Sequence, residues 1–318
     1  MRLEMISQRL KLRQLRIFLA VGQTGSMARA AKQLATSQSV VSKTIGELEE
    51  LLGVRLVDRS THGVELTAYG KVLLARSIAI LDDVRAGVNE IETLADPEAG
   101  ELRIGTTEPQ AGIVVRAIEK LSGRYPRIDF KVVVGSGLTL IDRELRGRQI
   151  DLVLGVMPDP AEDDLEAIIL YHNRMRVVVG MKSPWARESE VNLADLINEP
   201  WCAPPSDYVS GAFFREAFHA VGLPTPRIVV SCVANHVCHG LLADGRFVSI
   251  SSDGPLHFSE HGPALKVLPI DFPCPPFAIS IIMLRERTST PTTKLFVDCA
   301  QEITRPLTQT SLRVKRSS

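Results

Sequence analysis

Three short apolar repeats within residues 12–67 constrain the fold of this chain more than any other feature. In residues 12–22, apolar side chains recur at steps of three and four, which predicts an amphipathic helix. Ser26 follows a turn and offers an oxygen that can cap a second, Ala-rich helix. Ser37 is a second such cap, and the apolar pattern behind it predicts a third helix that ends near Leu52. The spacing is typical of a helix-turn-helix.

The first turns of the third predicted helix carry short polar side chains, and its apolar residues fall on the opposite face. A DNA major groove admits such a helix N-terminus, because donors and hydroxyls suit base edges and free amides attract phosphate. We therefore predict that this helix reads DNA through Gln38, Ser39, Ser42 and Lys43. Residues 60–67 have the turn chemistry of a two-stranded wing. The other predicted DNA-binding residues are Ser26, Arg29, Ser37, Arg55, Arg59 and His62.

The motifs in this part of the chain closely resemble those of the LysR-type transcriptional regulators. The resemblance is carried by residues 15–21, 25–26, 29–31, 34, 37–43, 48–49, 52–56 and 66–70. It implies sequence-specific DNA binding that is controlled by a small-molecule effector. Two residues depart from the family pattern: Ser39 stands where the family usually has proline, and Gly46 lies inside the third helix. A glycine there costs about 1 kcal/mol relative to alanine.

Charge is distributed unevenly along the 318 residues, although the formal net charge is zero. Residues 1–67 hold ten Lys and Arg against six Asp and Glu, a balance of +4, so the remainder carries −4. A basic module on an acidic body is expected when one domain meets phosphate and the other does not. No apolar run reaches membrane-spanning length, and the first residues lack the apolar stretch of a signal peptide. We therefore expect a cytoplasmic protein with no membrane partner.

Residues 68–95 predict one long helix, since they contain no proline. The apolar residues recur at nearly heptad spacing and would form a seam along one face of the helix, which indicates packing against a partner helix. The seam consists of Leu74, Ile78, Leu81, Val84, Val88, Ile91 and Ala95. A helix packed on its own body is the alternative, and the family resemblance favours a linker helix through which subunits form a homodimer or homotetramer. A symmetric dimer would demand a pseudo-palindromic operator, and contact with RNA polymerase is a further expectation.

Beyond the polar hinge at residues 96–100, strand-like runs alternate with helical runs, which predicts two parallel α/β units. The resemblance implies that they form a two-lobed effector-binding domain similar to the periplasmic binding proteins. The predicted fold class is therefore α+α/β. The predicted domains are a winged helix-turn-helix over 1–67, a linker helix over 68–95 and an effector-binding domain over 96–318, with lobe I at about 100–170 and 270–307 and lobe II at about 171–269.

Three predicted strand-to-helix junctions in this domain are polar, at the place where open α/β sheets bind ligands. Hydroxyls and free amides there suit a small anion. The predicted effector-binding residues are Thr106, Thr107, Ser136, Gly137, Ser206 and Asp207, of which Thr106, Thr107, Ser136 and Ser206 match positions that commonly touch the effector in the family. Asp207 would repel a bare anion, which leaves a hydroxylated or cationic effector open. Helix capping is the alternative role for these serines and threonines.

An enzyme on the α/β body is the competing class. The sequence contains no Gly-x-Gly-x-x-Gly, P-loop, Gly-x-Ser-x-Gly or His-Glu-x-x-His motif, and the acidic residues 162–164 are typical of a solvated loop. We therefore predict a regulator that is not an enzyme and has no cofactor besides its effector. A third class, a ligand-binding module whose helical head only oligomerises, stays open at this stage.

The five cysteines all lie in the C-terminal half and include no Cys-x-x-Cys pair. Cys232, His236, Cys238 and His239 have donor atoms enough for a metal or a redox pair. Their spacing matches no zinc pattern, however, and their apolar neighbours predict an ordinary packed helix. We therefore predict no metal site. Reduced structural thiols are the default in the cytosol, and a redox role for the cysteines stays open.

Overall fold

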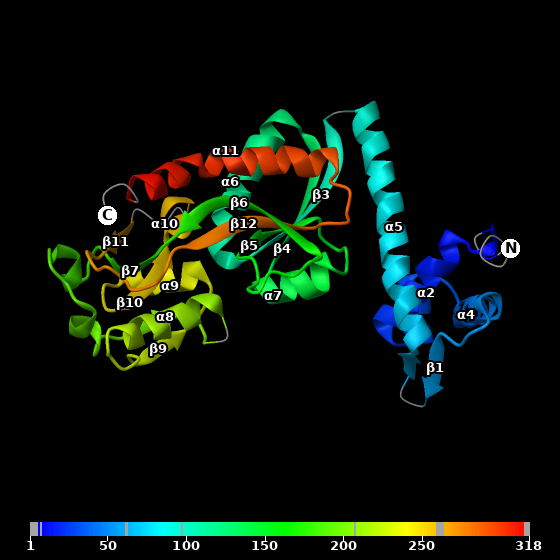
Figure 1. Ribbon diagram of the computed structural model, residues 1–318, viewed down its shortest axis with the longest axis horizontal. Coiled ribbons are helices and arrows are strands. Elements are labelled where there is room, and N and C mark those ends of the chain that lie inside the picture. The colour runs from blue at the N-terminus through cyan, green and yellow to red at the C-terminus, as the bar shows by residue number, and fades with distance from the viewer. Residues whose placement is uncertain are drawn as a thin grey trace. The chain divides into compact units, whose positions relative to one another are not determined.

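The computed structural model describes residues 6, 8–60, 63–96, 98–206, 208–258 and 264–314. The chain divides into two compact units, Met1–Ile91 and Glu92–Ser318. The long helix α5 (Ala68–Ala95) leads from the first unit into the second (Figure 1). Each unit has its own hydrophobic core.

Three helices build the first unit: α2 (Leu12–Thr24), α3 (Met27–Gln33) and α4 (Gln38–Leu52). Ser26 and Ser37 cap α3 and α4, because each side chain accepts a hydrogen bond from a backbone amide in the following turn, at 3.4 and 3.3 Å. Helices α2 and α4 end at Gly25 and Gly53, whose φ angles of 61° and 72° lie in the left-handed region that glycine adopts without strain. Local sequence signals therefore set all these boundaries.

A two-stranded wing follows α4. Strands β1 (Val57–Ser60) and β2 (Gly63–Leu66) pair antiparallel, with Ser60 opposite Gly63. The sequence prediction placed the wing over residues 60–67, and this is wrong for the first strand, which begins at Val57. The physical reason is that Val57 is buried in the core of the first unit and pairs with Leu66 of β2, so the strand begins before the turn residues.

Two five-stranded sheets form the second unit. The first has the order β4-β3-β5-β12-β6 and consists of β3 (Ala99–Thr106), β4 (Arg127–Val134), β5 (Leu152–Gly155), β6 (Leu165–Asn173) and β12 (Phe277–Leu284). The second has the order β11-β7-β10-β8-β9 and consists of β7 (Met175–Gly180), β8 (Trp201–Ala203), β9 (Ile228–Ser231), β10 (Val248–Ser252) and β11 (Leu265–Val267). We call the first sheet with its helices lobe I and the second lobe II.

The prediction of parallel α/β units is correct for β3, β4 and β5 of lobe I and wrong for β7 of lobe II, since each sheet combines parallel and antiparallel strands. Strand β3 does pair parallel with β4 and β5, and β8 pairs parallel with β9 and β10. Strand β12, however, runs antiparallel to β5 and β6, and β7 runs antiparallel to β10 and β11. The chain crosses from lobe I to lobe II after β6 and returns as β12, so these strands enter their sheets in the reverse direction.

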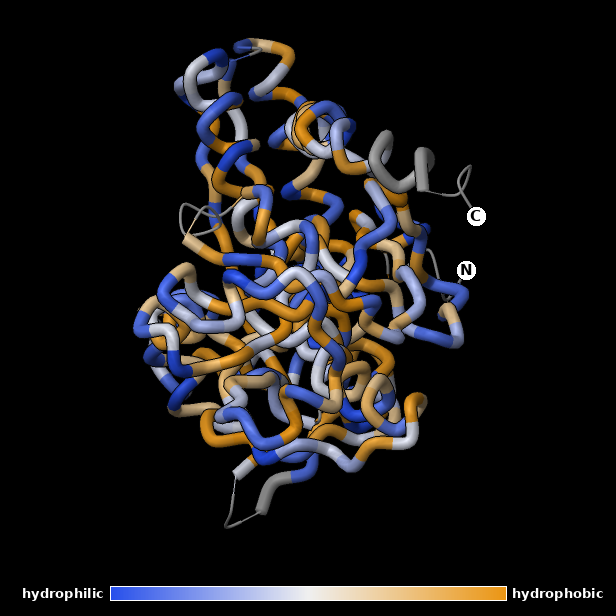
Figure 2. The backbone as a smooth tube through the Cα atoms, turned by 90° about the vertical axis from the view of Figure 1, so that its left-hand side faces the viewer, coloured by the Kyte–Doolittle hydropathy of each residue, from blue (hydrophilic) through white to orange (hydrophobic). Residues whose placement is uncertain are grey.

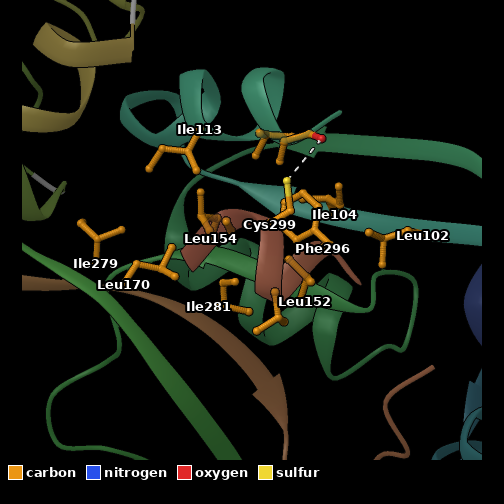
Figure 3. Close-up of a cluster of buried hydrophobic side chains, with 14 of the residues drawn as sticks. Leu102, Ile104, Ile113, Leu152, Leu154, Leu170, Ile279, Ile281, Phe296 and Cys299 are labelled. Atoms are coloured by element: carbon orange, nitrogen blue, oxygen red, sulfur yellow. Dashed lines mark hydrogen bonds between the residues drawn. The ribbon is translucent and has the colours of Figure 1, made fainter. Parts of the chain in front are cut away.

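Helices cover both faces of the lobe I sheet. Helices α6 (Ala111–Arg124) and α11 (Pro291–Val314) pack on one face, and α7 (Gly137–Thr139) with the π-helical segment Leu140–Leu145 packs on the other. Figure 3 shows side chains of β3, β5 and β12 around Phe296 and Cys299 of α11, with the Cys299 thiol 3.9 Å from the carbonyl oxygen of Ala117.

Helices α8 (Val209–Ala220), α9 (Asn235–Ala243) and α10 (Asp253–Phe258) follow strands of lobe II, with short 3-10 turns at Glu108–Gln110, Pro184–Arg187 and Leu193–Leu196 elsewhere in the unit. In the core of lobe II, the ring of Trp201 lies 5.0 Å from Phe214 and 5.5 Å from Phe218. Such clusters of fully buried aromatic side chains stabilise the sheet that carries them.

A buried carboxylate joins three segments of lobe I. Asp151, which is 6% exposed and precedes β5, accepts a hydrogen bond from the backbone amide of Arg103 at 2.7 Å. Its other oxygen accepts from the guanidinium groups of Arg103 at 2.8 Å and Arg287 at 2.6 Å. Removing one partner of a buried ion pair of this kind strongly lowers the stability of the fold, because it leaves an uncompensated charge in the interior.

Among the described residues, no helix has both the length and the apolar character needed to cross a bilayer. Hydrophilic and hydrophobic residues alternate along the chain (Figure 2).

Candidate functional sites

The two faces of α4 differ sharply. Its buried face packs into the core of the first unit through Val41, Ile45 and Leu48. The residues predicted to read DNA lie on the rest of its surface: Gln38, Ser39 and Lys43 are exposed, and Ser42 is half-buried. The Lys43 side chain is 79% exposed, with its Nζ 3.9 Å from a Glu47 oxygen. The first two turns of α4 therefore offer an amide, two hydroxyls and a cation on an open surface.

The remaining predicted DNA contacts divide into two groups. The hydroxyls of Ser26 and Ser37 accept backbone hydrogen bonds as helix caps, so these residues set where α3 and α4 begin. Arg29 and Arg55 are exposed. His62 and the side chain of Arg59 lie outside the described parts of the structure.

Glu49 is a positioning residue that is not among the residues predicted from the sequence. One oxygen of its carboxylate accepts hydrogen bonds from the amides of Leu56 at 2.8 Å and Val57 at 3.2 Å, which fixes the start of the wing to the end of α4. Hydrogen bonds to a charged acceptor are stronger than those to a neutral one. The only sequence signal for this role was the occurrence of Glu49 within a motif of the family resemblance.

Two of the predicted effector junctions meet at the ends of β3 and β4. Thr106 is fully buried and its hydroxyl already donates to the carbonyl of Thr107, at 3.1 Å. Ser136 caps α7: its oxygen accepts from the amide of Thr139 at 3.2 Å, and its hydroxyl donates to the Thr139 oxygen at 2.8 Å. Thr107 lies beside Gly137, since a Cβ built on that glycine would be 3.9 Å from the Thr107 methyl group. Thr107 is half-buried at this junction.

The third junction belongs to lobe II. Ser206 follows β8 and is exposed, and Asp207 lies outside the described residues. The backbone amide of Cys232 donates to the carbonyl of Ala203 at 3.1 Å, which places the segment before α9 beside the end of β8. The ends of β8 and β9 therefore present loop residues at one edge of the lobe II sheet.

A direct contact between the lobes was not predicted. The carboxylate of Glu108, in lobe I, accepts a hydrogen bond from the backbone amide of Asn235 at 3.2 Å, and the Asn235 side chain reaches the Glu108 carbonyl at 3.5 Å. Asn235 is the first residue of α9, and the preceding residue, Ala234, has no side chain that can cap the helix. Lobe I thus supplies the cap of a lobe II helix, and the carboxylate also suits the positive end of the helix dipole.

The acidic loop near residue 162 is an ion-pair network. The guanidinium group of Arg146 contacts Asp142, Glu162 and Asp164, with its Nε 2.9 Å from Asp164. Hydrogen bonding from Arg146 lowers the pKa of Asp164, so that carboxylate is held in its charged form. Within the described residues, no three His, Cys, Asp or Glu side chains form a group that could hold a metal ion.

A helix-turn-helix with a wing, followed by a long helix and two mixed α/β lobes, defines the class of two-domain, effector-controlled transcription factors. Two family models match the chain: "Bacterial regulatory helix-turn-helix protein, lysR family" over residues 12–71 and "LysR substrate binding domain" over residues 95–305. The chain therefore belongs to the LysR family of transcriptional regulators. It is a DNA-binding regulator with an effector-binding domain, and the family prediction made from the sequence is confirmed.

Relatives and solved structures agree with this assignment. The HTH-type transcriptional regulator GbpR of Azospirillum brasilense is 28% identical over 248 residues, which cover 77% of this chain and 72% of GbpR. A full-length OxyR variant from Pseudomonas aeruginosa has the same fold, with a TM-score of 0.66 at 21% identity over 92% of this chain and 95% of OxyR. Full-length CbnR in complex with its target DNA gives a TM-score of 0.51 at 22% identity, over 93% of this chain and all of CbnR (100%).

Proposed function

We propose that this regulator reads DNA with the exposed face of α4, and that a small-molecule effector bound between lobes I and II controls the outcome. The observation that carries the proposal is the segregation of α4 into a fully buried apolar face and an exposed polar N-terminal half. A helix in this state can enter a major groove without unfolding any part of its own core. CbnR, which shares the fold, has been solved with its target DNA.

The exposed residues of α4 have distinct proposed roles. Gln38 is the first residue of the helix, and its amide can bond both adenine edge atoms in the major groove. Ser42 supplies a hydroxyl that can donate or accept. The Ser39 hydroxyl lies 2.8 Å from that of Ser37 and, being exposed, keeps capacity for a further hydrogen bond, so both serines suit more than one base. The Lys43 side chain is 79% exposed and only weakly paired with Glu47, and we assign it to a phosphate contact. Arg29, Arg55, Arg59 and His62 are further proposed phosphate contacts, and Ser26 and Ser37 hold the starts of α3 and α4.

The proposed oligomer forms through α5. Leu73 and Leu74 pack on the helical core of the first unit, so they are not available to a partner. Farther along the helix, exposed apolar residues follow one another at steps of four, four, three and three: Ile80, Val84, Val88, Ile91 and Leu94. Their exposure rises to 83% at Leu94, and a second copy of the same helix would cover them. A two-fold dimer of this kind demands a pseudo-palindromic operator and can present a surface to RNA polymerase.

The proposed effector lies between the polar strand ends of lobe I and those of lobe II. The proposed domain boundaries lie near residues 67 and 95. Thr107 and Gly137 offer a half-buried hydroxyl and a backbone amide from lobe I, and we assign Ser206 and Asp207, which follow β8 in the sequence, to the lobe II side of the proposed site. The hydroxyls of Thr106 and Ser136 already have partners, so we assign these two residues to shaping the junction. A small polar molecule is the class of effector that this set of groups supports.

Binding to DNA from upstream of the neighbouring genes tests the proposal, measured by fluorescence anisotropy at 50 and 200 mM salt. Substitution Gln38→Ala should cost about 1–3 kcal/mol on the preferred sequence and little on unrelated DNA. Lys43→Ala should weaken binding to all sequences and reduce the salt slope by about 1. Glu50→Gln, at an exposed position near the end of α4, is the matched control. Unchanged affinity in folded Gln38→Ala and Lys43→Ala proteins would show that another surface binds DNA.

A further inference from the structure

Three cysteine thiols converge at one edge of lobe II. The Sγ atoms of Cys202, at the centre of β8, and Cys238, in the first turns of α9, are 3.2 Å apart. Cys232 precedes α9: its sulfur accepts a hydrogen bond from the Ala234 amide at 3.3 Å, and its carbonyl lies 3.8 Å from the Cys238 sulfur. All five cysteines are free thiols in this structure. The sequence pattern drew attention to residues 232–239 alone, whereas the nearest sulfur to Cys238 comes from a strand 36 residues earlier.

We propose that Cys202 and Cys238 are a redox-active pair that forms a reversible disulfide when the protein meets a peroxide. Their separation already brings the two sulfurs closer than an ordinary nonbonded contact, so no segment of the chain has to unfold before they react. The S–S distance of a disulfide is about 2.05 Å, which requires a closure of about 1 Å. The disulfide would link the lobe II sheet to α9 and would not join two strands of that sheet.

The chemistry balances with a hydroperoxide as the oxidant. One thiolate attacks the peroxide, the O–O bond breaks, and a sulfenic acid forms as the first water or alcohol leaves. The second thiolate attacks the sulfenic sulfur, the S–S bond forms, and a second water leaves. The two thiols together lose two electrons and two protons, and the peroxide takes up both. A dithiol reductant reverses the reaction by exchange.

The surroundings of the pair favour this reaction over the alternatives within the chain. The hydrogen bond shared by the two thiols lowers the pKa of Cys202 and raises the pKa of Cys238, so Cys202 is the thiol that ionises first, and the thiolate is the form that reacts. Cys202 is fully buried and Cys238 is half-buried, so a small oxidant would have to reach Cys202 from the Cys238 side. Cys274 and Cys299 instead donate to backbone carbonyls, at 3.5 and 3.9 Å, and they serve as internal references.

Oxidation would act on the element that contacts lobe I. Helix α9 begins at Asn235, whose amide is hydrogen-bonded to Glu108, and Cys238 lies one turn farther along the same helix. Drawing Cys238 toward β8 shifts this helix relative to its lobe I partner. The redox state of the pair therefore has a direct route to the relation between the two lobes, and it does not depend on which effector they bind.

Thiol counting on the full-length protein tests the proposal. The reduced protein is treated with a small excess of hydrogen peroxide, denatured, alkylated with N-ethylmaleimide and weighed by mass spectrometry. We expect the number of alkylated thiols to fall from five to three, with a disulfide-linked peptide pair joining Cys202 to Cys238, and dithiothreitol should restore all five. Fragment spectra must distinguish Cys238 from Cys232, because trypsin leaves both in one peptide.

Matched variants separate the pair from its neighbours. Cys202→Ser and Cys238→Ser should each prevent the loss of two thiols, whereas Cys232→Ser and Cys274→Ser should retain it. The wild-type peptide map decides the matter even if a variant fails to fold. No loss of thiols at peroxide levels that leave Cys299 reduced, or a link from Cys232 in place of Cys202, would overturn the proposal.

Discussion

Removing the Glu108 carboxylate should free the N-terminus of α9. The carboxylate accepts the Asn235 amide hydrogen bond at 3.2 Å and stands in for the cap that Ala234 cannot provide. Losing a helix cap costs about 1 kcal/mol, and a negative charge at a helix N-terminus adds about 0.3–1 kcal/mol. Because the contact is only partly buried, we expect a total near 1–2 kcal/mol for Glu108→Ala. That corresponds to a rise of about 5- to 30-fold in the opening equilibrium of the first turn.

Hydrogen exchange followed by mass spectrometry measures this opening directly, in peptides that contain the Asn235 amide. Glu108→Ala should speed exchange there by about 5- to 30-fold. Glu108→Gln should have a smaller effect, since a neutral amide oxygen still accepts a hydrogen bond. Glu119→Ala, which removes an exposed carboxylate on α6, is the control and should change nothing at α9. Unaltered exchange at Asn235 in Glu108→Ala would refute the capping role and, with it, this contact as a link between the lobes.

Three further substitutions test other parts of the structure. Asp151→Ala leaves the guanidinium groups of Arg103 and Arg287 without their shared carboxylate, and it should lower the free energy of unfolding by about 3–5 kcal/mol in urea titrations. The control, Asp142→Ala, removes an exposed ion pair and should lower it by no more than about 1 kcal/mol. Val88→Glu places a charge in the exposed apolar row of α5 and should dissociate the oligomer in sedimentation experiments, while Glu92→Gln should not. A Cβ added at Gly46 meets nothing within 4 Å, so Gly46→Ala should raise the free energy of unfolding by about 1 kcal/mol. A simultaneous loss of DNA affinity would indicate that the duplex approaches this glycine closely.

The parts of the structure that the sequence predicted are those with local signals. The starts of α3 and α4 follow from Ser26 and Ser37, and the ends of α2 and α4 from Gly25 and Gly53, because caps act within one turn of the residue that provides them. The polar face of α4 follows from helical periodicity in the same way. These signals are sufficient for the helix-turn-helix, and they do not depend on the rest of the chain.

The features that were missed depend on residues far apart in the sequence. Strands β8 and β11 have three residues each, too short for a periodic pattern, and they are extended because β10 and β7 pair with them. Glu108 and Asn235 are 127 residues apart, and no property of either residue alone indicates the other. The same holds for Cys202 and Cys238. Prediction from sequence therefore fails where pairing between distant segments, rather than local propensity, decides the structure.

Selection of binding sites from a random DNA pool tests most directly whether α4 is the recognition helix of a symmetric regulator. The wild-type protein should select a pseudo-palindromic motif whose half-sites lie about one helical turn apart. The Gln38→Ala protein should select the same motif with the preference lost at one position in each half-site, related by the two-fold axis. An identical motif from both proteins, or a site without symmetry, would contradict the account.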